Sequence, residues 1–164
     1  DNPDTPVLGT LKYRAYARIV AISRAVRDQL VAEGVPAGRI RVIPSAVEAD
    51  ACVPSWPRER FLAEFGLAPG ERVVATVAQL LPRKGHRLLL SAWPLVRQRC
   101  PDARLLCFGQ GPLAAELAAM AGLGGTVRFA GFRPDLREFL GHVDLLVHPA
   151  LAEGLGVSLL EAQA

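Results

Sequence analysis

The sequence has few aromatic residues and no long apolar run. Aromatic side chains make up 6% of the 164 residues, and Lys and Arg do not cluster with them, so we expect no nucleic-acid partner. No apolar run reaches the roughly 18 residues that span a membrane, and no signal-peptide pattern is visible. The sequence therefore predicts a cytoplasmic protein.

The cysteines are also few, and they form no recognisable motif. Cys52, Cys100 and Cys107 make no Cys-x-x-Cys pair, and no histidine lies at ligand spacing from them. An Asp-x-Asp metal motif is missing as well. We therefore expect reduced structural thiols, no metal site and no cofactor.

What is present is enough for a substantial core. Hydrophobic residues make up 51% of the chain and charged residues 21%, which suits one ordinary domain or parts of two. The net charge of +3 is spread along the chain and indicates no particular preference for anionic partners. Because the chain lacks an initiating Met and stops at Ala164 inside a predicted helix, we expect a fragment of a longer polypeptide.

Residues 1–47 are predicted to form the edge of one domain. Residues 18–22 and 39–43 have the pattern of short strands, and Ser23 is a good cap for the helix between them. A unit this small cannot bury its own faces, so it should belong to a larger domain. Residues 48–70 contain Pro54 and Pro57 and predict an interdomain linker followed by a helix.

Residues 71–164 predict an incomplete doubly wound α/β domain with a parallel sheet, because short strands alternate with helices. The strands are expected at 73–78, 104–108, 127–130 and 143–147, and the helices at 88–96, 113–120 and 135–140. We expect Pro94 to kink or split its helix, Pro112 to begin the next one, and Asp135 with Glu138 to form a capping box. The apolar fourth strand should be buried on both faces.

The expected strand order places a ligand. In the order 3-2-1-4-5-6 the first and fourth strands are neighbours, and a crevice opens at their carboxyl ends. The loop after the first strand contains Arg83, Lys84 and Gly85, and the loop after the fourth contains Glu153 and a helix start. Cations that face a helix N-terminus suit a diphosphate beside a polyhydroxylated group. We therefore expect these two loops to lie side by side.

The same two loops resemble the signatures of one enzyme family. Seven residues separate Glu153 from Glu161, with Gly154 and Gly156 among them, and the other loop has the run Arg83-Lys84-Gly85. This combination resembles the retaining nucleotide-sugar glycosyltransferases of family 4 (group 1). The resemblance implies the GT-B architecture of two Rossmann-like domains. It also implies a hexosyltransferase-like enzyme of glycan biosynthesis that moves a sugar from a nucleotide-diphosphate donor to an acceptor with retention.

The resemblance assigns parts of the chain to the two domains. Residues 1–47 would be the C-terminal edge of the acceptor domain, 48–70 the linker and helix, and 71–164 the nucleotide-sugar domain. The acceptor is not specified, and the resemblance leaves open whether the full-length protein lies peripherally at a membrane. The isolated chain is expected to be marginally stable and inactive.

The resemblance also assigns roles to residues. Arg83 and Lys84 would neutralise the pyrophosphate of a UDP-sugar or GDP-sugar, and Glu153 would hold the donor sugar, so that these three are the expected catalytic residues. Glu161 would bind the ribose hydroxyls. The expected donor-binding residues are Gly85, Gly131, Phe132, Arg133, Gly154, Leu155, Gly156 and Glu161. Gln79 stands where many family members have an arginine.

Two other functions compete with this interpretation. The run from Gly109 to Ala114 fits the G-x-G-x-x-A turn of an NAD(P)-dependent oxidoreductase. It lies on the second βα unit, however, and no acidic residue follows at the expected distance. A non-enzymatic nucleotide-binding module is the other alternative. The three histidines, His86, His142 and His148, have no partner at useful spacing and are interpreted as loop or core residues, with a phosphate contact left open for His86.

Overall fold

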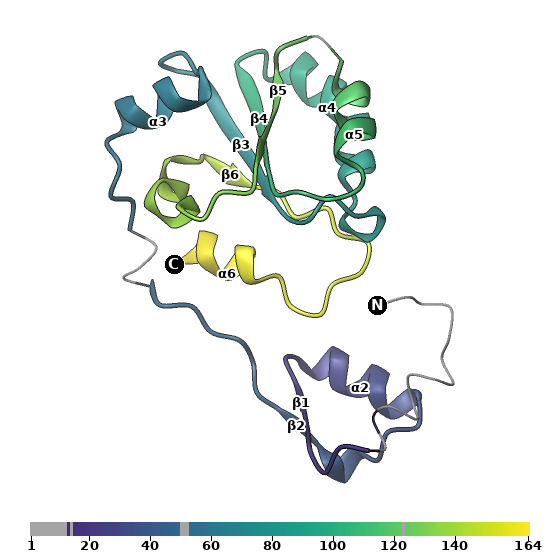
Figure 1. The fold of residues 1–164 in the computed structure, drawn as a ribbon. Coiled ribbons are helices and arrows are strands. Elements are labelled where there is room, and N and C mark those ends of the chain that lie inside the picture. The colour runs from purple at the N-terminus through teal and green to yellow at the C-terminus, as the bar shows by residue number, and fades with distance from the viewer. Residues whose placement is uncertain (1–12, 14, 50–52, 123) are drawn as a thin grey trace. The chain divides into compact units, whose positions relative to one another are not determined.

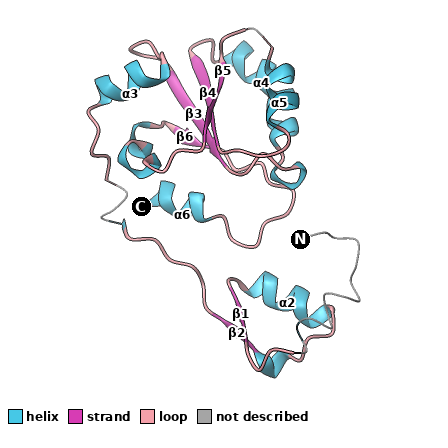
Figure 2. Ribbon diagram, viewed as in Figure 1, coloured by secondary structure: helices cyan, strands magenta, loops and turns pink. Residues whose placement is uncertain are grey.

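The computed structural model describes residues 13, 15–49, 53–122 and 124–164, which leaves Cys52 outside the described residues. The chain divides into two compact units, Asp1–Ala46 and Val47–Ala164. Figures 1 and 2 show both units as ribbons. Among the described helices, none is long and apolar enough to cross a membrane.

The described part of the first unit contains a strand–helix–strand motif, as predicted. Strands β1 (Ile19–Ala21) and β2 (Ile40–Val42) pair in parallel, and helix α2 (Arg24–Ala32) connects them. The Ser23 hydroxyl accepts a hydrogen bond of 3.2 Å from the Val26 amide, so Ser23 is the helix cap. The core of this unit is small, and side chains such as that of Val20 remain 58% exposed.

The second unit contains a four-stranded parallel sheet with helices between its strands. In chain order its elements are α3 (Arg58–Phe65), β3 (Arg72–Val77), α4 (His86–Arg99), β4 (Ala103–Phe108), α5 (Ala114–Ala121), β5 (Val127–Gly131), β6 (Leu145–Leu146) and α6 (Val157–Gln163). The strand order is β5-β4-β3-β6. When β3 is numbered as the first strand of this sheet, the order reads 3-2-1-4. The predicted order is therefore confirmed for these four strands.

Apolar side chains cover both faces of the sheet. Because side chains alternate along a strand, Val73 joins a cluster with Phe61 and Phe139, whereas Val74 joins a cluster with Trp93 and Leu117. In Figure 1, α4 and α5 accordingly lie on one side of the sheet and α3 on the other. This is the expected doubly wound α/β arrangement.

The structure differs from two predictions about prolines. Helix α4 is not split at Pro94 but continues through it. Pro94 has no N–H to donate to the carbonyl of Leu90, and the neighbouring buried Trp93 anchors the helix despite this lost hydrogen bond. Pro112 does not begin α5, which starts at Ala114. The residue between them, Leu113, instead donates its amide to the Leu80 carbonyl at 3.2 Å.

The predicted capping box is also wrong. Residues 136–142 form two short 3-10 turns in place of one helix, and the Asp135 side chain caps neither. Asp135 instead accepts hydrogen bonds of 2.8 and 2.7 Å from Arg133. The Glu138 carboxylate accepts one of 2.8 Å from the indole Nε1–H of Trp56. The side chains of Arg133 and Trp56 therefore bind the two carboxylates that were expected to cap the helix.

The fourth strand is shorter and more exposed than predicted. Ladder pairing with β3 is limited to Leu145 and Leu146, and Leu145 is 55% exposed. Just before it, the Asp144 carboxylate accepts the Val73 amide at 2.7 Å, so a side chain occupies a position that a backbone carbonyl would otherwise take. Among the described strands, β6 lies at the edge of the sheet and pairs with β3 alone.

Phe139 lies at the centre of the aromatic cluster, and its truncation tests this packing. Its ring is fully buried and lies 5.0 Å from the Trp56 ring and 5.2 Å from the Phe65 ring. We expect Phe139→Ala to lower the free energy of unfolding by about 3–5 kcal/mol in urea titrations. Phe132→Ala is the matched control, because this ring is 66% exposed and should change stability by less than about 0.5 kcal/mol. Equal losses in the two variants would contradict the assignment of this core.

Candidate functional site

The loops that follow β3 and β6 meet at the carboxyl edge of the sheet, as the strand order predicts. The Leu151 amide donates a hydrogen bond of 2.8 Å to the Arg83 carbonyl. Gly85 has φ +72°, and a Cβ built on it would lie 1.9 Å from the carbonyl oxygen of Pro149. Glycine is required here both for its backbone conformation and for the close approach of the two chains.

A charged cluster joins these loops. The Lys84 ammonium donates to Oε2 of Glu153, and the imidazole Nε2 of His148 lies 3.1 Å from the same oxygen. The other carboxylate oxygen accepts the Gly154 amide at 3.1 Å. The side chains of Lys84 and His148 are only 11% and 9% exposed, and that of Glu153 is 24% exposed. Three donors therefore hold one half-buried carboxylate.

The environment favours the ionised form of Glu153. Burial raises the pKa of its carboxyl group, but the hydrogen bond and the charge of Lys84, together with the bonds from His148 and Gly154, lower it more. The pKa of Glu153 is consequently below its ordinary value. At neutral pH the cluster presents an anion held between the two loops.

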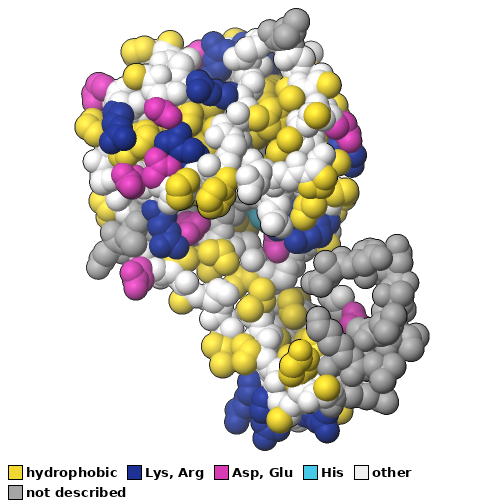
Figure 3. Space-filling view, in the orientation of Figure 1, with side chains coloured by type: hydrophobic (Ala, Val, Ile, Leu, Met, Phe, Trp, Pro, Cys, Tyr) yellow, Lys and Arg dark blue, Asp and Glu magenta, His cyan; other side chains and the backbone are white. Residues whose placement is uncertain are grey.

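A cavity of about 320 Å³ opens beside this cluster. It is lined by side chains and backbone from both loops and from the start of α6, among them Lys84, His148, Glu153, Leu155, Gly156, Ser158 and Glu161. Four predicted site residues that lie outside α6 therefore line the same cavity: Lys84, Glu153, Leu155 and Gly156. Arg83 lies in the adjoining loop, and its exposed guanidinium has no hydrogen-bonding partner among the described residues. Figure 3 shows basic, acidic and apolar side chains interspersed over the face of the second unit that it depicts.

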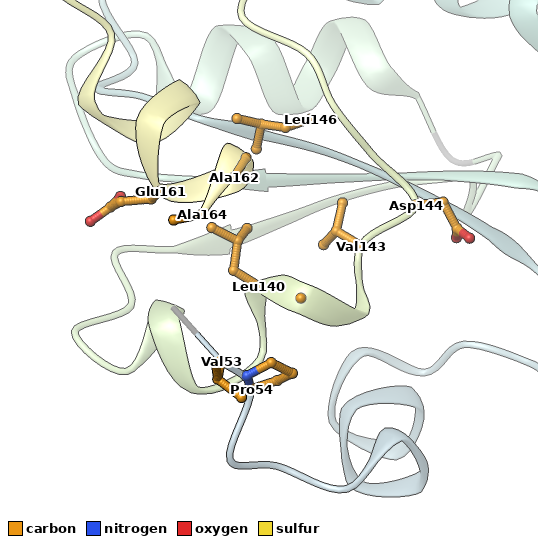
Figure 4. Close-up of a pocket in the computed structure, with 10 residues that line it drawn as sticks. Val53, Pro54, Leu140, Val143, Asp144, Leu146, Glu161, Ala162 and Ala164 are labelled. Carbon is orange, nitrogen blue, oxygen red and sulfur yellow. The ribbon is translucent and has the colours of Figure 1, made fainter. Parts of the chain in front are cut away.

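Glu161 lies at the boundary between this cavity and a second one of about 330 Å³. In Figure 4 the side chains of Leu140, Val143 and Leu146 point into the second cavity, whereas the carboxylate of Glu161 points away from it. Arg137 donates to Oε1 of Glu161 from Nε at 2.9 Å and from Nη2 at 2.8 Å. The carboxylate, 13% exposed, is therefore held in place by a cation.

Gly131, Phe132 and Arg133 are not brought into the cavity. The Arg133 guanidinium binds Asp135 on one side and Glu64 of α3, at 2.7 Å, on the other. It also lies 5.2 Å from the centre of the Phe139 ring. The hydrogen bonds that Arg133 donates to Asp135 raise the pKa of Arg133 despite partial burial. In this arrangement Arg133 links α3 to the loop after β5.

His148 belongs to the site although sequence spacing predicts no partner for it. That prediction is wrong, because its ring forms a hydrogen bond with Glu153. The available signal was its position directly after a strand at the carboxyl edge, five residues before Glu153. His86 is 2% exposed, and neither of its ring nitrogens has a partner among the described residues. Burial, followed by the nearby His148 and Lys84, lowers the pKa of His86, so this ring is neutral.

The glycines of the G-x-G-x-x-A turn have a structural explanation. A Cβ on Gly109 would lie 2.0 Å from the Ala78 carbonyl oxygen, and one on Gly111 would lie 2.6 Å from that of Leu80. The Leu80 amide also donates to the Gln110 carbonyl at 3.0 Å. The glycines let this turn pack against the loop after β3. No group of three metal-ligating side chains occurs in the part of the chain that the structure describes.

Comparison with known proteins identifies relatives along the whole chain. Residues 71–164 match the family model "Glycosyl transferases group 1". The chain is 31% identical to a GDP-mannose-dependent alpha-(1-6)-phosphatidylinositol monomannoside mannosyltransferase of Mycolicibacterium smegmatis, over 89% of this chain and 41% of the relative. It is also 31% identical to a D-inositol 3-phosphate glycosyltransferase of Mycobacterium sp. (strain KMS), over 100% of this chain and 39% of the relative. The chain thus spans about two fifths of the length of these relatives.

Solved structures of similar fold include a protein crystallised with UDP and glucose and a glycosyltransferase. The crystal structure of Anabaena Alr3699/HepE in complex with UDP and glucose matches with a TM-score of 0.81 and 25% identity, covering 95% of this chain and 44% of that one. WaaG, a glycosyltransferase involved in lipopolysaccharide biosynthesis, matches with a TM-score of 0.71 and 23% identity. The match covers 88% of this chain and 41% of WaaG. The second likeness concerns the fold alone.

Substitution of Gly85 tests the contact between the two loops. Gly85→Ala places a methyl group against the Pro149 backbone at a positive φ, and neither the backbone oxygen nor the tight turn can move freely. We expect a loss of about 1–3 kcal/mol or more in the free energy of unfolding. Gly124→Ala serves as the control, because no atom lies within 4 Å of its Cβ position. If both variants unfold at the same urea concentration, the loops do not approach as described.

Proposed function

The chain belongs to the glycosyl transferases group 1 family, and from this premise we propose that the cavity between the loops after β3 and β6 binds the diphosphate and sugar of a nucleotide-sugar donor. The whole protein would transfer that sugar to an acceptor with retention. The donor is a UDP-sugar or a GDP-sugar: one relative is named as GDP-mannose-dependent, and HepE was solved with UDP and glucose.

The observation that carries the proposal is the location of Lys84. Its nearly buried ammonium lines a cavity at the carboxyl edge of the sheet, between the neighbouring strands β3 and β6. Doubly wound sheets bind ligands at this point, where the strand order reverses. An ammonium has three N–H donors, and Glu153 takes one of them, so Lys84 has N–H donors left for a phosphate oxygen.

The other groups have complementary tasks in this proposal. Arg83, exposed in the same turn, adds a second positive charge for the diphosphate. Glu153 and the amides around Gly154 and Gly156 hold the donor sugar and its phosphate, and Glu161 accepts hydrogen bonds from the ribose hydroxyls. These groups surround the cavity with cations where a leaving diphosphate develops charge and with acceptors where hydroxyl groups lie.

In the transfer step, the bond between the sugar C1 and the diphosphate oxygen breaks as the acceptor hydroxyl oxygen bonds to C1 on the same face. The hydroxyl proton passes to the departing phosphate oxygen, and a nucleoside diphosphate leaves. No side-chain nucleophile is assigned. Lys84 and Arg83 stabilise the negative charge that grows on the diphosphate, which lowers the barrier only to the extent that they bind the transition state better than the donor.

Kinetics of the whole protein test these roles. We expect Lys84→Ala to lower turnover by about tenfold to a hundredfold, the equivalent of one charge-assisted contact of about 1.5–3 kcal/mol. Glu161→Ala should act mainly on the KM for the donor, because ribose contacts bind the ground state and transition state about equally. Steady-state rates with UDP-sugars and GDP-sugars provide the measurement.

Arg87→Ala is the control for charge removal. Arg87 lies three residues further along the chain, pairs with Glu116 on the surface and does not line the cavity. The turnover of the Arg87→Ala variant should therefore equal that of the unmodified protein. Unchanged turnover in Lys84→Ala would end the assignment of the diphosphate to this loop.

A further inference from the structure

The cavity contains an imidazole whose role the family resemblance does not assign. We propose that His148 is a positioning residue, which holds the Glu153 carboxylate in the orientation that meets the donor sugar. The proposal rests on the proposed function, because it specifies how one group of that site is kept in place.

The hydrogen bond between the two side chains has a defined direction. His148 Nε2 lies 3.1 Å from Glu153 Oε2, and the carboxylate is ionised because its pKa is lowered. An ionised carboxylate only accepts hydrogen bonds. The proton must therefore be on Nε2, and His148 donates.

The surroundings of the ring favour the same tautomer. His148 Nδ1 is buried and has no partner among the described residues. A proton on Nδ1 would be a buried donor without an acceptor, which is destabilising, whereas a lone pair is less costly to leave unpaired. These contacts favour an imidazole with its N–H on Nε2, directed at Glu153.

The ring is held more firmly than the carboxylate that it contacts. Its side chain is 9% exposed and immediately precedes Pro149, whose ring restricts the backbone of the residue before it. A Cβ on Gly156 would lie 3.5 Å from His148 Nε2, so the loop closes over the imidazole. His148 and Glu153 both lie outside helices and strands, but the side chain of Glu153 is the more exposed of the two, at 24%. The fixed ring can therefore position the carboxylate, but the reverse is not expected.

The other side-chain donor to Glu153 has a second task. Lys84 has a flexible stem and a point charge that the proposed mechanism uses on the diphosphate. When a donor is bound, Lys84 can shift toward phosphate. The imidazole N–H, with its fixed direction, then keeps one oxygen of Glu153 occupied and leaves the remaining lone pairs to face the sugar hydroxyls.

Two substitutions of nearly equal size separate positioning from packing. His148→Gln retains an N–H donor at the ε position, and His148→Met fills a similar volume without a donor. Calorimetric titration of the whole protein with UDP-glucose, GDP-mannose, UDP and GDP provides the readout. Comparison of each sugar nucleotide with its free nucleotide isolates the contribution of the sugar, which is the part of the ligand that Glu153 is proposed to meet.

We expect His148→Met to raise the Kd of the bound sugar nucleotide about threefold to tenfold, as for one lost hydrogen bond. The Kd of the corresponding free nucleotide should remain within about twofold, since the diphosphate contacts of Lys84 are retained. His148→Gln should restore most of the lost affinity, and Glu153→Gln should reproduce the sugar-specific loss. A merely structural role of the ring would weaken free and sugar-bearing nucleotides alike in both variants.

Other outcomes would overturn the proposal in distinguishable ways. Equal affinities in His148→Met and the unmodified protein would remove the role of His148 and leave the donor site intact. Equal losses in the Met and Gln variants would mean that the ring acts by packing. A sugar-specific loss in His148→Met without one in Glu153→Gln would mean that the ring contacts the sugar itself. An unmodified protein that binds none of the four nucleotides would overturn the proposed function as well.

Discussion

The parallel pairing of β3 with β6 is the constraint on which the site depends. Its ladder is only two residues long, Val74 with Leu145 and Ala75 with Leu146. Asp144 reinforces it by donating its amide to the Val73 carbonyl at 2.9 Å and by accepting the Val73 amide on its carboxylate. A slip of one residue would turn every side chain of β6 to the other face and would separate the two loops that hold the charged cluster.

The cations of the second unit divide into two groups with different tasks. Arg133 has its guanidinium fully engaged by two carboxylates and nearby rings, so its charge stabilises the fold. Lys84 and Arg83 retain donors that no described residue uses, and both lie at the edge of the sheet where the strand order reverses. A planar guanidinium suits the stabilisation of the fold because it can bind several partners at once. A compact ammonium beside a cavity suits the binding of a ligand.

The sequence predicts most of the fold but only part of the site. The apolar runs that alternate along the chain are local signals, and so are the positions of Lys84 and Glu153 after two strands. The rules of strand order then predict that the two loops lie side by side. The contacts of Glu138 with Trp56 and of Arg133 with Glu64 join residues about 70 to 80 positions apart. No local pattern indicates such contacts, which is why a capping box and a donor-side Arg133 were expected. His148 was missed for the same reason, since only the folded loop directs its ring at Glu153.

The central claim is that a donor diphosphate binds between Arg83–Lys84 and the amides near Gly154 and Gly156. The most direct measurement is a crystal structure of the protein with UDP or GDP bound. Our account predicts a phosphate oxygen within hydrogen-bonding distance of Lys84 Nζ, with the ribose facing Glu161. A diphosphate bound at the turn between Gly109 and Ala114, away from Lys84, would contradict it.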